Sequence, residues 1–164
     1  MNRRIFLHRT SLLAAIGLVP LAGTAGNPAN PETFEVHHSE EEWRKLLGGA
    51  AFRVLRQEDT ERPFTSPLLE EHRAGMFRCA GCALPLFSSE TKFESHTGWP
   101  SFWKPLPGAI SRRDDSSFGM QRIEVHCRRC GGHQGHVFDD GPKPTGLRYC
   151  INGLSLTFAP GATA

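Results

Sequence analysis

Two closely spaced cysteine pairs constrain the fold of this chain more than any other feature. Cys79 and Cys82 form one C-x-x-C sequence, and Cys127 and Cys130 form a second. Two such turns supply the four thiolates of a tetrahedral S₄ site, the geometry that zinc prefers. We therefore predict one structural Zn²⁺ per chain that joins two distant parts of the sequence, since a site with four protein ligands has no open position for a substrate.

Other uses of these cysteines stay open at this point. Exported proteins use disulfides, and a C-x-x-C sequence also serves as a redox pair. His126, His133 and His136 lie close to the second pair in the sequence, where a histidine can replace one sulfur ligand. Two C-x-x-C pairs in one small domain favour zinc over these alternatives.

The fifth cysteine, Cys150, stands alone in the sequence "RYCIN". Alternate side chains of a strand share a face, so we expect Arg148, Cys150 and Asn152 to point the same way. A positive charge beside a thiol favours its thiolate, and Asn152 is a candidate to hold a substrate. The alternative is a buried and chemically inert cysteine.

Two further stretches carry residues typical of an active site. In "GGHQGHVFDDG", His133 and His136 are candidate proton donors because imidazole titrates near neutral pH, and Asp139 and Asp140 are candidates to orient one of them. In "HTGWPSFW", Trp99 and Phe102 are candidates for the wall of an apolar cavity. The alternatives are a polar turn around glycines and ordinary core packing.

The mature part of the chain is predicted to be mainly β, with short helices at its N-terminal end. Seventeen glycines and twelve prolines indicate many turns. Ser39 followed by Glu42 fits a capping box that begins a helix, and Gly48–Gly49 suits its end. A second short helix is expected from Ala50 to Gln57. Short strand candidates and turns follow from Gly75 onward.

Residues 1–25 have the pattern of an export signal. A charged start is followed by an apolar run, too short to span a bilayer, and by small residues. Arg3 and Arg4 resemble the start of a bacterial twin-arginine signal, which predicts a periplasmic or otherwise exported protein cut after Ala25. A membrane anchor or a buried helix is the alternative. Residues 26–33 form a polar linker.

The charge of the remaining chain excludes two classes of partner. Arg3, Arg4 and Arg9 supply three of the nineteen basic residues, which leaves sixteen against seventeen acidic ones. Such a balance provides no basic stripe for nucleic acid and no polybasic membrane patch. We expect no nucleic-acid partner, no stable membrane anchor and a monomer.

Several motifs together resemble the B-type methionine sulfoxide reductases. The stretches "PFTSPLL", "CAGCALPLF", "GWPSFW", "GMQRIEVHCRRC", "GHQGHVFDDGP" and "TGLRYCINGLSLTF" follow one another in that family's order. The resemblance covers residues 34–160, and residues 161–164 form a tail. It implies small coiled antiparallel sheets stapled by zinc, and reduction of the R epimer of methionine sulfoxide, chiefly within oxidised proteins.

The resemblance also assigns roles to residues. It implies Cys150 as the nucleophile, with His136 as the first choice of acid and His133 beside it. It implies that Asp140 supports this histidine, that Arg148 lowers the pKa of the thiol and that Asn152 helps to fix the substrate. The remaining implied positions are Trp99 for the aromatic wall and Cys79, Cys82, Cys127 and Cys130 for the zinc.

The sequence departs from the family's pattern at Thr97, where many members have a second redox cysteine. No cysteine is then left to resolve a sulfenic acid on Cys150, so we expect an outside reductant: a thioredoxin-like protein, a glutaredoxin-like protein or a small thiol. A zinc module that only binds a partner, or a thiol redox sensor, are the other classes of function. A lone activated thiol beside two histidines argues against a binding module.

Overall fold

The computed structural model describes residues 33–161 of the chain. The predicted export signal and almost all of the predicted linker lie outside the described residues, as do positions 162–164. Among the described residues, no helix has both the length and the apolar character needed to cross a membrane.

Helix α1 (Glu40–Gln57) begins and breaks where the sequence predicts. The side chain of Ser39 accepts a hydrogen bond from the backbone N–H of Glu42, and the Glu42 carboxylate accepts one from the backbone N–H of Ser39. Gly48 has non-helical backbone angles, with φ at 71°, so the element consists of two short helices joined at a kink. The helix buries Trp43 and Phe52 against the β-sheets.

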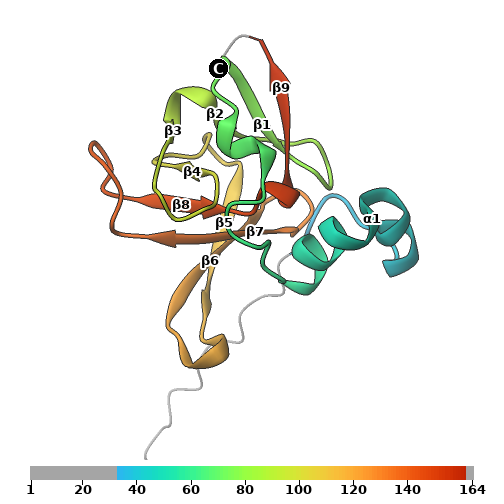
Figure 1. Ribbon diagram of the computed structural model, residues 1–164. Coiled ribbons are helices and arrows are strands. Elements are labelled where there is room, and N and C mark those ends of the chain that lie inside the picture. Colours follow the sequence, from blue (N-terminus) through green and yellow to red (C-terminus); the bar gives the residue numbers. More distant parts are fainter. Residues whose placement is uncertain (1–32, 162–164) are drawn as a thin grey trace, which may run out of the picture. The chain divides into compact units, whose positions relative to one another are not determined.

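The strands form two antiparallel sheets (Figure 1). The three-stranded sheet has the order β2 (Pro85–Ser88), β1 (Gly75–Cys79) and β9 (Leu156–Pro160). The six-stranded sheet has the order β3 (Lys92–Phe93), β4 (Ser101–Phe102), β8 (Arg148–Ile151), β7 (His133–Phe138), β6 (Arg122–Cys127) and β5 (Ile110–Asp115). In the described part of the chain, the 3₁₀ helix η1 (Pro67–Glu70) lies between α1 and β1. Three further 3₁₀ helices lie between strands: η2 (Ser89–Thr91), η3 (Ser117–Gly119) and η4 (Gly153–Ser155). The predicted mainly β fold with an N-terminal helical segment is confirmed.

An aromatic cluster fills the core between the two sheets. Phe102 is fully buried and stacks on Phe87, with ring centroids 4.4 Å apart. Phe77 packs edge-on against the Phe102 ring, with ring centroids 4.9 Å apart. Phe102 pairs with the buried Tyr149 across β4 and β8, so it shares the core face of the sheet. Phe102, expected in the substrate wall, therefore belongs to the core, because strand alternation directs it away from Cys150.

A β-bulge between β6 and β7 decides which side chains share a face. Val125 pairs with Gly135, and His126 pairs with His133, so Gln134 has no residue opposite it. In a regular strand, His133 and His136 would point to opposite faces, since they are three positions apart. The extra residue shifts the alternation by one position. Both imidazoles consequently lie on one face, with ring centroids 5.4 Å apart.

The register of the six-stranded sheet aligns one row of chemically active side chains across five strands. Ser101 on β4 lies opposite Cys150 on β8, and Cys150 lies opposite His136 on β7. The row continues to Glu124 on β6 and Arg113 on β5. Residues directly opposite in an antiparallel sheet have Cβ atoms about 4.5–5.5 Å apart, so neighbouring members of this row are within reach of one another.

Candidate active site and metal centre

A pocket of ≈ 130 Å³ opens at the centre of this row. Cys150 and His136 lie in its wall, and the predicted aromatic residue Trp99 is also part of it. The remaining lining residues are Thr60, Arg122, Gly135, Phe138 and Asn152. The pocket thus combines a thiol, an imidazole and aromatic surface, although these residues come from segments far apart in the sequence.

The Cys150 thiol is mainly protonated at neutral pH in this environment. Burial raises its pKa above the ordinary cysteine value, while hydrogen bonding from Thr97 and the positive charge of Arg148 act in the opposite direction without outweighing it. The thiol sulfur lies 3.8 Å from the Thr97 hydroxyl oxygen. The expected influence of Arg148 has the predicted sign, since its charge lowers the pKa of this thiol, but burial raises that pKa by more.

Arg148 pairs with Asp140 while it also acts on the Cys150 thiol. Its Nε and Nη2 atoms each donate a hydrogen bond of 2.8 Å to the Asp140 carboxylate, and its guanidinium stacks over Phe138 at 4.4 Å from the ring centroid. The Arg148–Asp140 pair explains why Arg148 has a limited effect on the pKa of Cys150, because the Asp140 carboxylate offsets the charge of the guanidinium. The expected contact of Asp140 with a catalytic histidine is thus replaced by one with Arg148.

The carboxylate that supports His136 is that of Asp115, at the end of β5. His136 Nε2 lies 2.8 Å from Asp115 Oδ2, and Arg122 donates to the same oxygen at 2.6 Å. Burial lowers the pKa of His136, and the hydrogen bond to Asp115 partly opposes this shift. The imidazole is therefore mainly neutral at pH 7. With Nε2 hydrogen-bonded to Asp115, Nδ1 is the nitrogen left for the pocket.

His133 lies beside His136 but serves a neighbouring polar cavity. Its Nδ1 is 2.7 Å from the buried Glu124 carboxylate, whose other oxygen pairs with Arg113 Nε at 2.5 Å. His133 lines a second cavity of ≈ 450 Å³, which also has His136 in its wall, while only His136 lines the pocket around Cys150. Of the two predicted histidines, His136 has the geometry to exchange a proton with a group bound at the thiol.

The segment between α1 and η1 closes one side of the pocket, and Glu61 fixes it there. The Glu61 N–H donates to Asn152 Oδ1 at 2.9 Å, and its carbonyl accepts from Trp99 Nε1 at 2.9 Å. Its carboxylate accepts from the Leu154 N–H at 3.1 Å. Asn152 also donates to the Gln134 carbonyl at 3.1 Å. The Asn152 amide therefore orders the pocket wall through two backbone groups.

Gly135 allows β7 to approach Cys150 closely. A Cβ atom at this position would lie 2.0 Å from the Cys150 carbonyl oxygen, a distance that no side chain tolerates. Gly135 also faces the pocket. The glycine in "GHQGH" is thus explained by the packing of two backbones, and it keeps the space beside the thiol open.

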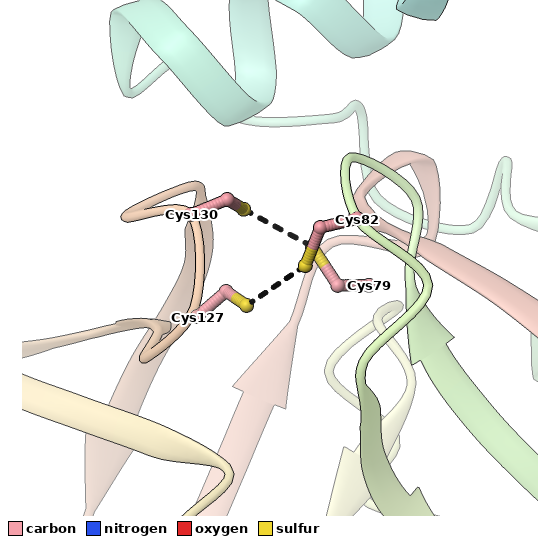
Figure 2. A group of neighbouring side chains, drawn as sticks. All are labelled: Cys79, Cys82, Cys127 and Cys130. Atoms are coloured by element: carbon pink, nitrogen blue, oxygen red, sulfur yellow. Dashed lines mark hydrogen bonds between the residues drawn. The ribbon is translucent and has the colours of Figure 1, made fainter. Parts of the chain in front are cut away.

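The other four cysteines gather in one cluster, away from this row. Figure 2 shows their side chains converging from two turns. Their sulfurs all lie within 4.8 Å of one another, with Cys79 and Cys130 at 3.7 Å and Cys82 and Cys127 at 3.5 Å. Sulfurs bound at about 2.3 Å to a tetrahedral ion are about 3.8 Å apart, whereas disulfide sulfurs are about 2.05 Å apart. All five cysteines are free thiols, so the cluster fits a metal ion.

The two turns that carry these cysteines have equivalent backbone geometry. In the first, the Cys79 N–H donates to the Leu84 carbonyl and the Ala83 N–H donates to the Cys79 carbonyl, at 2.9 and 2.8 Å. In the second, Cys127 bonds with Gly132 and Gly131 in the same pattern and at the same distances. The first turn belongs to the three-stranded sheet and the second to the six-stranded sheet, so a shared ion would link both sheets.

Three residues of the site were missed by sequence reasoning: Asp115, Arg122 and Glu61. Asp115 and Arg122 are cross-strand partners at the turn end of the β5–β6 hairpin, and the sequence "DDSSFGMQR" places an acid and a base on either side of that turn. That pattern was a usable signal for the pair. Glu61 acts through its backbone N–H and carbonyl and through its carboxylate, and no residue pattern in the sequence indicates these contacts.

Taken together, the pocket is suited to nucleophilic attack by sulfur on a small group that has both an apolar part and a proton-accepting atom. The thiol supplies the nucleophile, and the neutral His136 accepts and returns a proton. The side chain of Trp99 offers apolar surface.

The charges around Cys150 predict that two substitutions change the pKa of its thiol in opposite directions. We expect Arg148→Gln to raise the pKa of Cys150 further, because the Asp140 charge then acts alone, and Asp140→Asn to lower it. The measurement is the pH dependence of iodoacetamide alkylation at Cys150, followed by peptide mass spectrometry. Arg44→Gln on the exposed face of α1 is the control without an effect. Shifts of the same sign in both variants would contradict this electrostatic account.

Comparison with known proteins places the chain in a family. A family model described as the SelR domain matches residues 47–160. The chain is 51% identical over 127 residues to "Peptide methionine sulfoxide reductase MsrB" of Agrobacterium fabrum, covering 77% of this chain and 94% of the relative. It is 52% identical over 126 residues to the protein of that name from Leptospira interrogans, covering 76% and 96%. The protein of that name from Methanosarcina barkeri is 54% identical over 124 residues, covering 75% and 87%.

These matches include both cysteine pairs, the pocket and the solitary thiol within one continuous domain. The chain belongs to the SelR-domain family of B-type methionine sulfoxide reductases, oxidoreductases that act on the sulfur of oxidised methionine.

Proposed function

We propose that the chain reduces the R epimer of methionine sulfoxide, chiefly within proteins, and that Cys150 is the attacking group. The observation that carries this proposal is the position of Cys150 directly opposite His136, in a pocket that also contains Trp99. The indole ring supplies an apolar surface for the methyl group of the substrate, while the sulfoxide oxygen faces the imidazole. The preference for one epimer rests on the family resemblance.

The first step transfers an oxygen atom to sulfur. The neutral His136 takes the proton of the Cys150 thiol and becomes an imidazolium, which the Asp115 carboxylate stabilises. The Cys150 sulfur attacks the sulfoxide sulfur, and His136 returns the proton to the oxygen as negative charge develops there. Methionine leaves, and Cys150 retains the oxygen as a sulfenic acid. The two products contain all atoms of the thiol and the sulfoxide.

The second step needs a thiol from outside the chain. Thr97 lies beside Cys150 where many members of the family have a second redox cysteine, and the other four cysteines lie together in the cluster suited to a metal ion. An external thiol displaces the sulfenic oxygen as water and forms a mixed disulfide with Cys150. A second thiol then releases the free enzyme and an oxidised reductant. A thioredoxin-like protein, a glutaredoxin-like protein or a small thiol has the required chemistry.

We propose a structural zinc ion as the occupant of the four-cysteine cluster. An all-sulfur ligand set with this spacing is typical of zinc sites that stabilise folds. The ion would cross-link the β1–β2 turn to the β6–β7 turn, and it has no part in the reaction steps described above.

We also propose that residues 1–25 direct export through the twin-arginine route, to the periplasm or beyond. This proposal is supported by the paired Arg3 and Arg4, the short apolar run and the small residues before Gly26. Such a route carries folded proteins, so the metal would be bound before the chain leaves the reducing cytosol.

The reaction is tested with peptides that contain one epimer of methionine sulfoxide and with dithiothreitol as reductant. We expect turnover of the R epimer alone, and a loss of about three orders of magnitude or more in Cys150→Ser. Thr157→Ser, at an exposed position of β9, is the matched control. After one turnover without reductant, mass spectrometry should find one added oxygen on Cys150, trapped by a dimedone-type reagent. A disulfide between Cys150 and another cysteine would contradict this cycle.

Metal content tests the second proposal. Elemental analysis of the purified protein should find about one zinc per chain, and Cys82→Ser should lose the ion together with at least about 3 kcal/mol of the free energy of unfolding. Cys150→Ser is the control, because it removes a thiol and should retain the zinc. A Cys82→Ser protein with unchanged stability would contradict a structural role.

Export is tested by fractionating a bacterial host that expresses the full chain. We expect a mature protein that begins at Gly26 outside the cytoplasm, and an uncleaved cytoplasmic protein when Arg3 and Arg4 are both replaced by lysine. Arg9→Lys, in the same segment but outside the arginine pair, is the matched control and should be exported normally. Equal export of the paired variant would argue against the twin-arginine route.

A further inference from the structure

A chain of three hydroxyl groups leads from the Cys150 thiol to the backbone of the aromatic wall. The Thr97 hydroxyl lies 3.8 Å from the Cys150 sulfur and 2.8 Å from the Ser95 hydroxyl. Ser95 in turn lies 2.7 Å from the Ser101 hydroxyl, which donates to the Trp99 carbonyl at 3.1 Å. Ser101 is fully buried, so its hydroxyl depends on these partners for its hydrogen bonds.

The far end of the chain fixes the direction of every bond in it. A carbonyl oxygen only accepts, and a hydroxyl has a single proton to donate. Since Ser101 donates to the Trp99 carbonyl, it accepts from Ser95, and Ser95 accepts from Thr97. Thr97 has then used its proton and presents a lone pair to the sulfur. In this direction the chain accepts from the Cys150 S–H group and stabilises the protonated thiol.

Ionisation of Cys150 requires the opposite direction. A thiolate has no proton to donate and accepts hydrogen bonds strongly. For Thr97 to donate to it, Ser95 must donate to Thr97 and Ser101 must donate to Ser95, so the Trp99 carbonyl loses its hydroxyl donor. Each hydroxyl rotates and keeps its own proton, because a carbonyl is too weak a base to take one. The thiol proton leaves through the pocket.

We propose that Thr97, Ser95 and Ser101 form a reversible hydrogen-bond chain that sets the ionisation of Cys150. In one direction the chain stabilises the thiol, and in the other it stabilises the attacking thiolate at the expense of one bond to the Trp99 carbonyl. Thr97 contacts the reacting sulfur, whereas Ser95 and Ser101 act through it as positioning residues. The proposal rests on Cys150 as the nucleophile of the function proposed above.

Charged groups also face Cys150 from several elements, and their effect on its ionisation is the same in all variants of the three hydroxyl residues. They are Arg148 on β8 with Asp140 beyond β7, His136 on β7, and Arg122 and Asp115 on β6 and β5. None of them is hydrogen-bonded to Thr97, Ser95 or Ser101 in the described part of the chain. Variants of the three hydroxyl residues remove no charge, so their effects report on the chain itself.

The three positions differ in the sign of their expected effect. Thr97→Val removes the donor that the thiolate needs, so ionisation becomes less favourable. Ser101→Ala removes the bond that holds the chain in its thiol direction, and Ser95→Ala uncouples Thr97 from that bond. In Ser95→Ala the Ser101 hydroxyl keeps its bond to the Trp99 carbonyl whichever way Thr97 points, and in Ser101→Ala that bond is already absent. In both variants Thr97 therefore donates to the thiolate without the loss of a further hydrogen bond. Residues that only fill space or pack locally would not produce opposite signs.

The test measures the rate of iodoacetamide alkylation at Cys150 in the purified, metal-containing full chain at neutral pH. One neutral hydrogen bond corresponds to a change of roughly three- to tenfold in the thiolate fraction. We expect alkylation to be slower by about that factor in Thr97→Val, and faster in Ser95→Ala and Ser101→Ala. Thr97→Ser retains the hydroxyl and should restore a rate near that of the unaltered protein.

Circular dichroism establishes that each variant is folded, and Ser95→Ala provides the decisive result if the buried Ser101→Ala does not fold. Slower or unchanged alkylation in Ser95→Ala overturns the proposal, as does unchanged alkylation in Thr97→Val. Alkylation needs no sulfoxide, so a failure to reduce methionine sulfoxide would contradict the proposed function without affecting this result.

Discussion

The convergence of four cysteine sulfurs from two turns is the constraint on which the rest of the structure depends. One turn joins β1 to β2 in the three-stranded sheet, and the other joins β6 to β7 in the six-stranded sheet. The strands are only two to six residues long, so each sheet alone buries little apolar surface. A metal ion held by the four sulfurs would link the two turns, fix the sheets against the aromatic core and thereby fix β7. The histidines and the bulge that orients them lie on that strand.

The register of β7 then determines the chemistry of the pocket. The bulge at Gln134 brings His133 and His136 to one face, and the pairing of β7 with β8 places Cys150 opposite His136. The two imidazoles nevertheless have different partners, because Asp115 holds one and Glu124 holds the other. At rest, the neutral imidazole and the protonated thiol carry no charge. A proton can pass from the thiol to the imidazole when the reaction begins. For the proposed mechanism, this arrangement gives a half-buried thiol whose protonated form is favoured before substrate binds.

The sequence was sufficient for the parts of the structure that depend on local patterns. The capping box at Ser39, the break at Gly48, the two cysteine turns and the alternation in "RYCIN" all follow from spacing and residue type. The partners of polar side chains did not follow, because they depend on strand register. Asp140 lies next to β7 in the sequence, yet it pairs with Arg148, while the distant Asp115 reaches His136 through the β5–β6 hairpin. Phe102 was misplaced for the same reason, since only its pairing with Tyr149 reveals the face that it occupies.

The immobility of Cys150 connects the core to the reaction. Tyr149 and Ile151, the neighbours of Cys150 in β8, are almost fully buried. Their packing in the core anchors the backbone of β8 on the face of the sheet opposite the Cys150 side chain. On one side of Cys150, Gly135 of β7 packs closely against the Cys150 carbonyl oxygen. On the other side, Ser101 of β4 lies directly opposite Cys150. As the proposed nucleophile, a sulfur held in this way loses little freedom when it attacks, which favours reaction with a correctly seated substrate. Because Cys150 is half-buried, solvent screens its sulfur incompletely, and the direction of the neighbouring Thr97 hydroxyl in the proposed hydrogen-bond chain then has a larger effect on the thiol.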